Sequence, residues 1–322
     1  MLRNTWLIVL AVHAGGAAAQ GSGLAYPAKP VRIVVPSSPG GGTDILARIV
    51  AQKLSENLRQ QFVVENRPGA GQVIGIESVA RSAPDGYTVL MAASAIVINE
   101  VLYAKPPYDT LRDFVPVTLG ASLPNILVAH PALPVKSVRE LIAFAKTRPA
   151  QLNYSSAGSG TSPHMSMELF RTMAAITITH IPYKGTGPAT TDLLAGQVQL
   201  SMPNVLTALP HIKAAKLRAL GVTSGKRAAG LPDIPTIAES GVPGYEAIQW
   251  YGLLAPAGTP RDIVNKVQAE TARVLLLPEV KERLSADGAE PVGNRPDEFA
   301  AYIRAELVKW DKVVKSAGIK LE

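Results

Sequence analysis

A glycine-rich loop near the start of the chain offers the hydrogen-bond donors that a small anion needs. It follows a largely β-branched run at 31–35, which is typical of a buried strand, and contains three consecutive glycines at 40–42. Thr43 or Asp44 can then cap a helix. Because a helix N-terminus presents free N–H groups and the positive end of its dipole, this loop favours an anion site. Many such turns bind nothing, so the assignment of an anion site depends on the rest of the chain.

A second loop in the middle of the chain carries the same chemistry. After a short strand expected at 152–154, hydroxyl side chains and glycines fill 155–162, and a helix begins near His164. The glycines expose backbone amides and the hydroxyls add donors, which again suits a carboxylate. A glycine string at 69–75 follows the second strand of its unit instead of the first, so it does not favour a nucleotide site.

The elements that position these loops alternate between strands and helices. A strand at 31–35, a helix from Asp44 to about Asn57 and a strand at 62–65 predict a βαβ unit with parallel strands. Further strands are expected at 88–91, 115–119, 125–129, 176–181, 197–202, 217–223 and 250–255, and closing helices at 260–276, 279–284 and 296–317. This order predicts two α/β lobes, the second inserted in the first, with a ligand held between them.

Composition excludes several classes of protein. Hydrophobic residues make up 47% of the 322 residues and charged residues only 18%, which excludes wholesale disorder. The net charge of +7 is scattered, without basic runs or interleaved aromatic residues, so nucleic-acid binding is not expected. The chain has no cysteine, which excludes disulfides, a thiol nucleophile and a thiolate metal site.

The first residues predict a secretory signal peptide at 1–19. Arg3 gives a positive start, 6–12 is a short apolar segment, and the alanines at 17–19 form a cleavage site. No later stretch approaches the roughly 18 apolar residues of a membrane helix. We therefore expect export of a soluble chain, and the absence of cysteine suits a bacterial periplasm.

A secreted α/β hydrolase is the main alternative. His164 near Ser156 and Ser159, together with Asp192, resembles a hydrolase constellation, but no G-x-S-x-G sequence surrounds these serines. A role of His164 in ordering the helix start or lining a pocket is favoured over catalysis. The remaining internal histidines are isolated, so no metal site is expected. Asp44 is expected to cap its helix or to order the loop.

Taken together, these stretches resemble the tripartite tricarboxylate transporter solute-binding proteins, also called the Bug receptors. The resemblance covers essentially the whole chain after the signal peptide. The segments that carry it are YPAKPVR at 26–32, PGG at 39–41 with Asp44 and AR at 47–48, VENRPGAG at 64–71, PDGYT at 84–88, YSSAGSGTSPH at 154–164, PYKG at 182–185, LPD at 231–233 with PT at 235–236, and APAGTP at 255–260.

The resemblance implies a two-lobed periplasmic-binding-protein fold of the second type, with the ligand in the interdomain cleft. The expected domains are 25–124 with 228–322, and 125–227. The implied function is capture of a small carboxylate and its delivery to the membrane subunits of a transporter, without catalysis or a cofactor. We expect a monomer. A sensor that feeds a signalling system remains an alternative.

In this family, two loops grip the carboxylate through backbone amides, hydroxyls and water. Here they correspond to 37–44, which we name the first elbow, and 156–164, the second elbow. The predicted ligand-binding residues are Ser37, Ser38, Pro39, Gly40, Gly41, Gly42, Thr43, Asp44, Ser94, Ser156, Ala157, Gly158, Ser159, Gly160, Thr161, His164, Tyr183, Lys184 and Asn204. For Tyr183 and Lys184, a solvated surface turn is an equal alternative to a pocket rim. At Asn204, many relatives have an acidic residue, so a ligand without an amino group is favoured.

Overall fold

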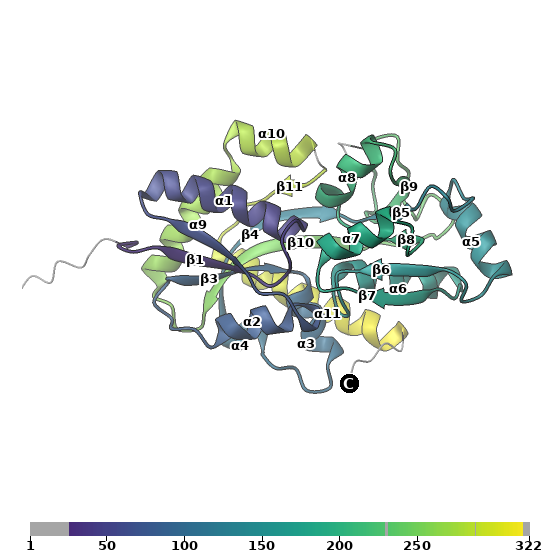
Figure 1. The fold of residues 1–322 in the computed structure, drawn as a ribbon. Coiled ribbons are helices and arrows are strands. Elements are labelled where there is room, and N and C mark those ends of the chain that lie inside the picture. Colours follow the sequence, from purple (N-terminus) through teal and green to yellow (C-terminus); the bar gives the residue numbers. More distant parts are fainter. Residues whose placement is uncertain (1–25, 229–230, 287, 318–322) are drawn as a thin grey trace, which may run out of the picture.

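The computed structural model describes residues 26–228, 231–286 and 288–317. The predicted signal peptide at 1–19 lies outside these residues. The described chain forms two sheets with helices around them, and we name the part built on the larger sheet lobe 1 and the part built on the smaller sheet lobe 2 (Figure 1). No helix in the described part of the chain is both long enough and apolar enough to cross a bilayer.

The sheet of lobe 1 has six strands in the order β11-β4-β10-β3-β1-β2. The strands are β1 (Val31–Val35), β2 (Phe62–Asn66), β3 (Thr88–Ala93), β4 (Phe114–Pro124), β10 (Ile248–Pro256) and β11 (Glu290–Pro291). β1 pairs in parallel with β2 and β3, which confirms the predicted βαβ unit, whereas β10 runs antiparallel to β3 and β4. The two strands β4 and β10 reach furthest toward lobe 2.

Helices cover both faces of this sheet. The helices of lobe 1 are α1 (Gly42–Leu58), the 3-10 turn η1 (Ala70–Gln72), α2 (Val73–Ala80), α3 (Ala95–Leu102), α4 (Thr110–Asp113), α9 (Arg261–Leu275), α10 (Pro278–Ala286) and α11 (Pro296–Ala317). Successive residues of a strand point to opposite faces, so Met91 packs in the cluster of α1 and α9 while Leu90 packs in that of α2, α3 and α11. Burial on both faces explains why these strands are apolar throughout.

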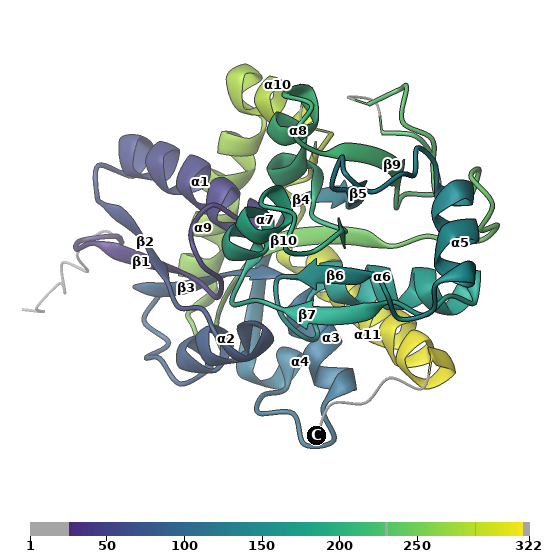
Figure 2. The same cartoon turned by 45° about the vertical axis from the view of Figure 1, so that its right-hand side comes forward.

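The sheet of lobe 2 has five strands in the order β7-β6-β8-β5-β9. They are β5 (Ile126–Ala129), β6 (Asn153–Ser156), β7 (Thr179–Pro182), β8 (Leu200–Ser201) and β9 (Arg218–Val222). The helices of this lobe are α5 (Val138–Thr147), α6 (Ser162–Ala174), α7 (Thr186–Leu194) and α8 (Val205–Lys213). Figure 2 shows lobe 2 turned toward the viewer, with α7 and α8 facing the end of α1.

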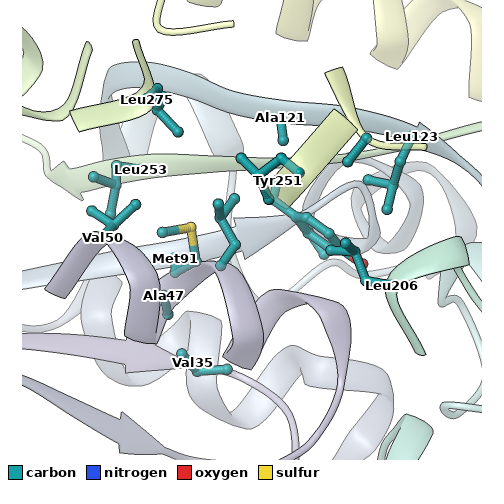
Figure 3. Close-up of a cluster of buried hydrophobic side chains, with 14 of the residues drawn as sticks. Val35, Ala47, Val50, Met91, Ala121, Leu123, Leu206, Tyr251, Leu253 and Leu275 are labelled. Carbon is teal, nitrogen blue, oxygen red and sulfur yellow. The ribbon is translucent and has the colours of Figure 1, made fainter. Parts of the chain in front are cut away.

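The largest core cluster continues from lobe 1 into lobe 2. Figure 3 shows Val50 of α1 against Leu253 of β10, and Leu206 of α8 beside the ring of Tyr251. These four side chains are at most 5% exposed. The two lobes therefore share apolar contacts as well as chain crossings.

The chain crosses between the lobes at segments that are hydrogen-bonded side by side. Asn125 follows β4, and its backbone N–H donates to Thr223 Oγ1 at 2.8 Å. The N–H of Thr223 donates back to Asn125 O at 2.9 Å, and Ala247 N–H donates to Thr223 O at 2.9 Å. We name these three residues the hinge.

Most predicted strands are present, but several differ in extent. β7 begins only at Thr179 where a strand was expected over 176–181, and β8 is confined to Leu200–Ser201 within the expected 197–202. A strand was expected at 115–119 and a second at 125–129, whereas β4 continues from Phe114 to Pro124 before β5 begins. The nine-residue strand β10 pairs with 121–124, which accounts for the extension. The partner strand lies more than 120 residues away, so no local signal indicates this extension. The predicted domain boundaries stay a prediction.

A buried carboxylate fixes α11 against β10, which generates a prediction about stability. Glu306 Oε2 accepts from the indole nitrogens of Trp250 and Trp310, both at 3.0 Å, and both indoles are buried. Glu306→Ala leaves two buried donors unpaired, so we expect a loss of about 2–4 kcal/mol in the free energy of unfolding, measured with urea. Lys312→Ala, exposed on the same helix, serves as the control and is expected to change stability by less than about 0.5 kcal/mol. Similar losses for both variants would contradict this role.

Candidate functional site

A small polar cavity lies between the lobes. Its volume is about 20 Å³, the space of about one water molecule. The lining residues come from both lobes, and those of lobe 1 include two residues of β10. They are Ser37, Gly41, Gly42, Thr43, Gln72, Asn125, Ala157, Ser162, Pro163, Thr186, Asn204, Gln249 and Tyr251. None of these lining residues carries a full charge.

Five helices begin at this cavity. Lining residues sit at the first turns of α1, α6 and α7 and at the N-cap positions of α2 and α8. Only α8 is capped by a side chain, because Asn204 Oδ1 accepts from the N–H of Thr207 at 3.1 Å. The N-cap residues of the other four, Gly41, Gln72, Thr161 and Gly185, make no side-chain cap bond. Their N–H groups and dipoles make the cavity attractive to an anion.

A buried network holds the first elbow. Asp44 Oδ2 accepts from Gly40 N–H and from Arg48 Nε, both at 3.0 Å, and Asp44 Oδ1 accepts from Asn66 Nδ2 at 3.0 Å. Asn66 Nδ2 also donates to Ser37 O at 3.0 Å. Burial raises the pKa of Asp44, but these hydrogen bonds outweigh it and hold the pKa below its usual value. The charged carboxylate therefore orders the loop from behind and does not face the cavity.

Local hydrogen bonds also fix the second elbow. Gly158 N–H donates to Ser156 Oγ at 3.1 Å, and Thr161 Oγ1 donates to Gly158 O at 2.6 Å. Gly160 N–H donates to His164 Nδ1 at 3.1 Å. Gly158 and Gly160 have φ values of 124° and 76°, which glycine adopts without strain. This folding brings Ala157 and the start of α6 to the cavity.

Neutral polar groups complete the lining. Burial raises the pKa of Tyr251, so its phenol stays protonated and able to donate. Gln249 Oε1 accepts from Ser94 Oγ at 3.0 Å, which fixes this amide. Asn125 Nδ2 donates to the hydroxyls of Ser162 and Ser166 at 2.9 and 3.0 Å, so the hinge is tied directly to α6.

The structure brings part of the predicted set to the cavity. The predicted residues that line it are Ser37, Gly41, Gly42, Thr43, Ala157 and Asn204. The other predicted members of the elbows lie beside or behind these residues, outside the lining: Ser38, Pro39, Gly40, Asp44, Ser156, Gly158, Ser159, Gly160, Thr161 and His164. Their roles in ligand binding stay predictions.

Three predicted residues lie further away. Ser94 is behind Gln249. Tyr183 donates to Asp192 Oδ2 at 2.6 Å, and it lies with Lys184 beside an open depression that Gly71 also lines. These two residues are therefore at the rim between the lobes and not in the cavity.

Sequence reasoning missed several lining residues. Ser162 lies within the second elbow but was not among the predicted ligand-binding residues, and Thr186 directly follows the PYKG segment at 182–185. The hinge contributes Asn125, and β10 contributes Gln249 and Tyr251. In the sequence, the only signal for these residues was a polar side chain among apolar neighbours. These residues reach the cavity only through the pairing of strands that are distant in the sequence.

The suggested hydrolase constellation is not assembled by the described contacts. Asp192 bonds to Tyr183, and the histidine that contacts Ser156 Oγ is His180, with its Nε2 at 2.6 Å. Ser156 is 1% exposed and lies outside the cavity lining. Among the described residues, no three histidine or carboxylate side chains are grouped to hold a metal.

Comparisons with known proteins give consistent matches along the chain. A family model described as tripartite tricarboxylate transporter family receptor matches residues 46–319. Protein BugT of Bordetella pertussis is 39% identical over 324 residues, covering 100% of this chain and 99% of BugT. A solved structure from R. palustris with adipate is 41% identical with a TM-score of 0.89, covering 92% of this chain and 99% of that one.

A second solved structure, MatC from Rhodopseudomonas palustris with bound malate, is 33% identical with a TM-score of 0.86. The match covers 90% of this chain and 100% of MatC. The solved structures confirm the predicted two-lobed α/β fold class.

The network around Asp44 generates a prediction. Both carboxylate oxygens accept, so Asp44→Asn must turn an NH₂ group toward a donor, and we expect a loss of about 1–3 kcal/mol in the free energy of unfolding at pH 7. The low pKa of Asp44 means that its contribution is present above about pH 4 and lost as the pH falls further, so variant and wild type should converge there. Urea unfolding at pH 7 and 3 measures this. Glu56→Gln, exposed on α1, is the control, and equal losses in both variants would contradict the assignment.

Proposed function

The chain belongs to the tripartite tricarboxylate transporter receptor family, and we propose that it binds a small carboxylate in the cavity between its lobes. The observation that carries this proposal is the meeting of five helix N-termini at one polar cavity without a charged side chain. Four of these helices lack a side-chain cap, so their N–H groups are suited to carboxylate oxygens. The adipate and malate bound by two similar structures support this ligand class.

We propose further that the ligand lacks an ammonium group. A buried ammonium needs a carboxylate or several acceptors as partners, and the lining contains no acidic side chain. Asn204 offers an amide oxygen, but this oxygen already accepts from Thr207 N and from Thr207 Oγ1 at 3.1 and 3.2 Å. The lining therefore favours a simple carboxylic acid over an amino acid.

Close contacts between the lobes support a receptor that opens to admit its ligand. A Cβ on Gly187 would lie 2.9 Å from Pro39 O, and one on Gly71 would collide with Ser159 O. The first contact joins the start of α7 to the first elbow and the second joins η1 to the second elbow, so both cross between the lobes. Because the cavity is about 20 Å³, a dicarboxylate fits only when these contacts separate or adjust.

We place the protein in the periplasm, after removal of residues 1–19, as a monomer that hands its ligand to membrane subunits of a transporter. The family description and the solved periplasmic binding protein BugD support this assignment. The protein is proposed to be a receptor and not an enzyme, because Ser156 and His180 form a contact that substrate in the cavity does not reach. Consumption of a bound carboxylate during incubation would contradict this.

The ligand class is tested by thermal unfolding of the purified chain with a panel of acids. A ligand at about 100 times its dissociation constant adds about 2.7 kcal/mol to stability, which raises the midpoint by several degrees. We expect shifts from dicarboxylates such as adipate, malate or glutarate, and at least tenfold weaker binding of glutamate than of glutarate. Equal binding of glutamate would contradict the absence of an ammonium site. If no carboxylate raises the unfolding midpoint of the folded protein, the proposed ligand class is contradicted.

A glycine pair tests the position of the site. A Cβ on Gly42 would lie 2.7 Å from Asn204 Oδ1 and would also collide with the Tyr251 hydroxyl, inside the cavity. We therefore expect Gly42→Ala to weaken binding of the best ligand about 10- to 100-fold in calorimetry. A Cβ on Gly41 meets only Thr186, at an ordinary 3.5 Å, so Gly41→Ala should bind more tightly than Gly42→Ala. The reverse order would show that the ligand lies elsewhere.

A further inference from the structure

Three aromatic rings are stacked behind the second elbow. The ring of His180 on β7 lies between those of Tyr154 on β6 and His164 on α6, with centroid distances of 4.8 and 4.2 Å and interplanar angles of 20° and 24°. Tyr154 is fully buried and His164 is 6% exposed. None of these rings lines the cavity, so their contacts have no direct part in the proposed ligand binding.

Each imidazole is hydrogen-bonded to the elbow. His164 Nδ1 accepts from the N–H of Gly160 at 3.1 Å, which requires this nitrogen to be unprotonated. His180 Nε2 lies 2.6 Å from Ser156 Oγ. Ser156 Oγ also accepts from Gly158 N–H and donates to Gly158 O, both at 3.1 Å, so the short contact with His180 Nε2 completes the hydrogen bonding of this hydroxyl. The two histidines thus hold both ends of the second elbow.

We propose that His164 and His180 are positioning residues, which hold the second elbow in its ligand-binding conformation only while both imidazoles are neutral. Protonation of His164 Nδ1 removes the acceptor for Gly160, and protonation of His180 places a charge in the stack against the buried ring of His164. Two imidazolium rings 4.2 Å apart would also repel each other. The inference rests on the proposed function for its effect on the ligand, but the contacts themselves are independent of it.

The surroundings favour the neutral rings. Burial lowers the pKa of His164 to about 4, and burial together with the neighbouring His164 lowers that of His180 to about 3. The charged groups that act on the rings are Glu168 and Arg171, both on α6, and they form an ion pair at 2.6 Å. On β6, the Tyr154 hydroxyl donates to Glu168 Oε1 at 2.7 Å. The charge of Glu168 raises the pKa of both rings and that of Arg171 lowers it, but burial is the largest effect on each.

The direction of the pH effect follows from these lowered pKa values. An imidazole released from the stack regains a pKa near 6.5, so it binds protons more readily than the stacked ring. The contribution of the stack is complete above about pH 6.5 and is lost progressively as the pH falls toward 4. Mild acid therefore favours a released elbow and weaker ligand binding.

The first experiment compares two substitutions at one position. His164→Asn places an amide oxygen near Nδ1 and keeps an acceptor for Gly160, whereas His164→Phe keeps a ring but removes the acceptor. We expect faster amide hydrogen exchange across 156–164 in His164→Phe than in His164→Asn, and about tenfold weaker adipate binding at pH 7. Equal exchange in His164→Phe and wild type would overturn the positioning role of His164.

The second experiment uses the double variant His164→Asn with His180→Gln, which keeps a hydrogen-bonding group at both positions but cannot be protonated. Between pH 7 and 5, we expect adipate affinity and protection of 156–164 to fall about tenfold more in wild type than in this variant. Titration of adipate itself affects both proteins equally. His211→Asn on α8 is the control and should follow the wild type. Parallel profiles for the double variant and wild type would overturn the proposal.

The two proposals fail separately in these experiments. If wild type is folded but adipate and the rest of the carboxylate panel do not bind, the proposed ligand class fails. Hydrogen exchange of 156–164 then still decides the positioning role, because it needs no ligand.

Discussion

The N–H groups at the first turns of the helices around the cavity are the constraint on which the site depends. A buried N–H needs an acceptor, and α1, α2, α6 and α7 lack the side-chain cap that would supply one. The chain directs these helix ends toward one another from two lobes, so first turns without a side-chain cap are concentrated around one cavity. The glycine-rich elbows follow from the same requirement, because side chains there would separate the backbones from a ligand.

Full charges lie behind the elbows and not at the cavity. Asp44 is paired with Arg48 under the first elbow, and Glu168 is paired with Arg171 behind the second. Both carboxylates accept several hydrogen bonds, and both have pKa values held below the usual range against the effect of burial. The charged pairs thus support loops whose exposed surface is neutral. This arrangement separates the groups that fix the geometry from those that line the cavity.

The sequence was sufficient to locate both elbows and to predict two α/β lobes, because glycine, hydroxyl residues and short apolar runs are local signals. The start of α1 at Gly42, two residues ahead of the expected Asp44, is a small difference of this local kind. Contacts that depend on distant pairing were not predictable: Asn125 and Tyr251 reach the cavity only because β4 and β10 pair along their whole length. The stacking of His164 on His180 was also not predictable, because the two residues are 16 positions apart in the sequence and are brought together by the packing of α6 and β7.

The neutral lining also bears on how the protein meets its ligand in a medium of changing salinity. The field of a helix end fades within about a turn, whereas the field of an unpaired arginine or lysine extends over a Debye length of about 8 Å at physiological salt. A site made of helix ends in a buried cavity exerts little long-range attraction, and dissolved ions screen its short-range contacts only weakly. Capture by such a site depends on the fit of the ligand after it enters, so it varies little with ionic strength. A lining of cationic side chains would make it far more sensitive.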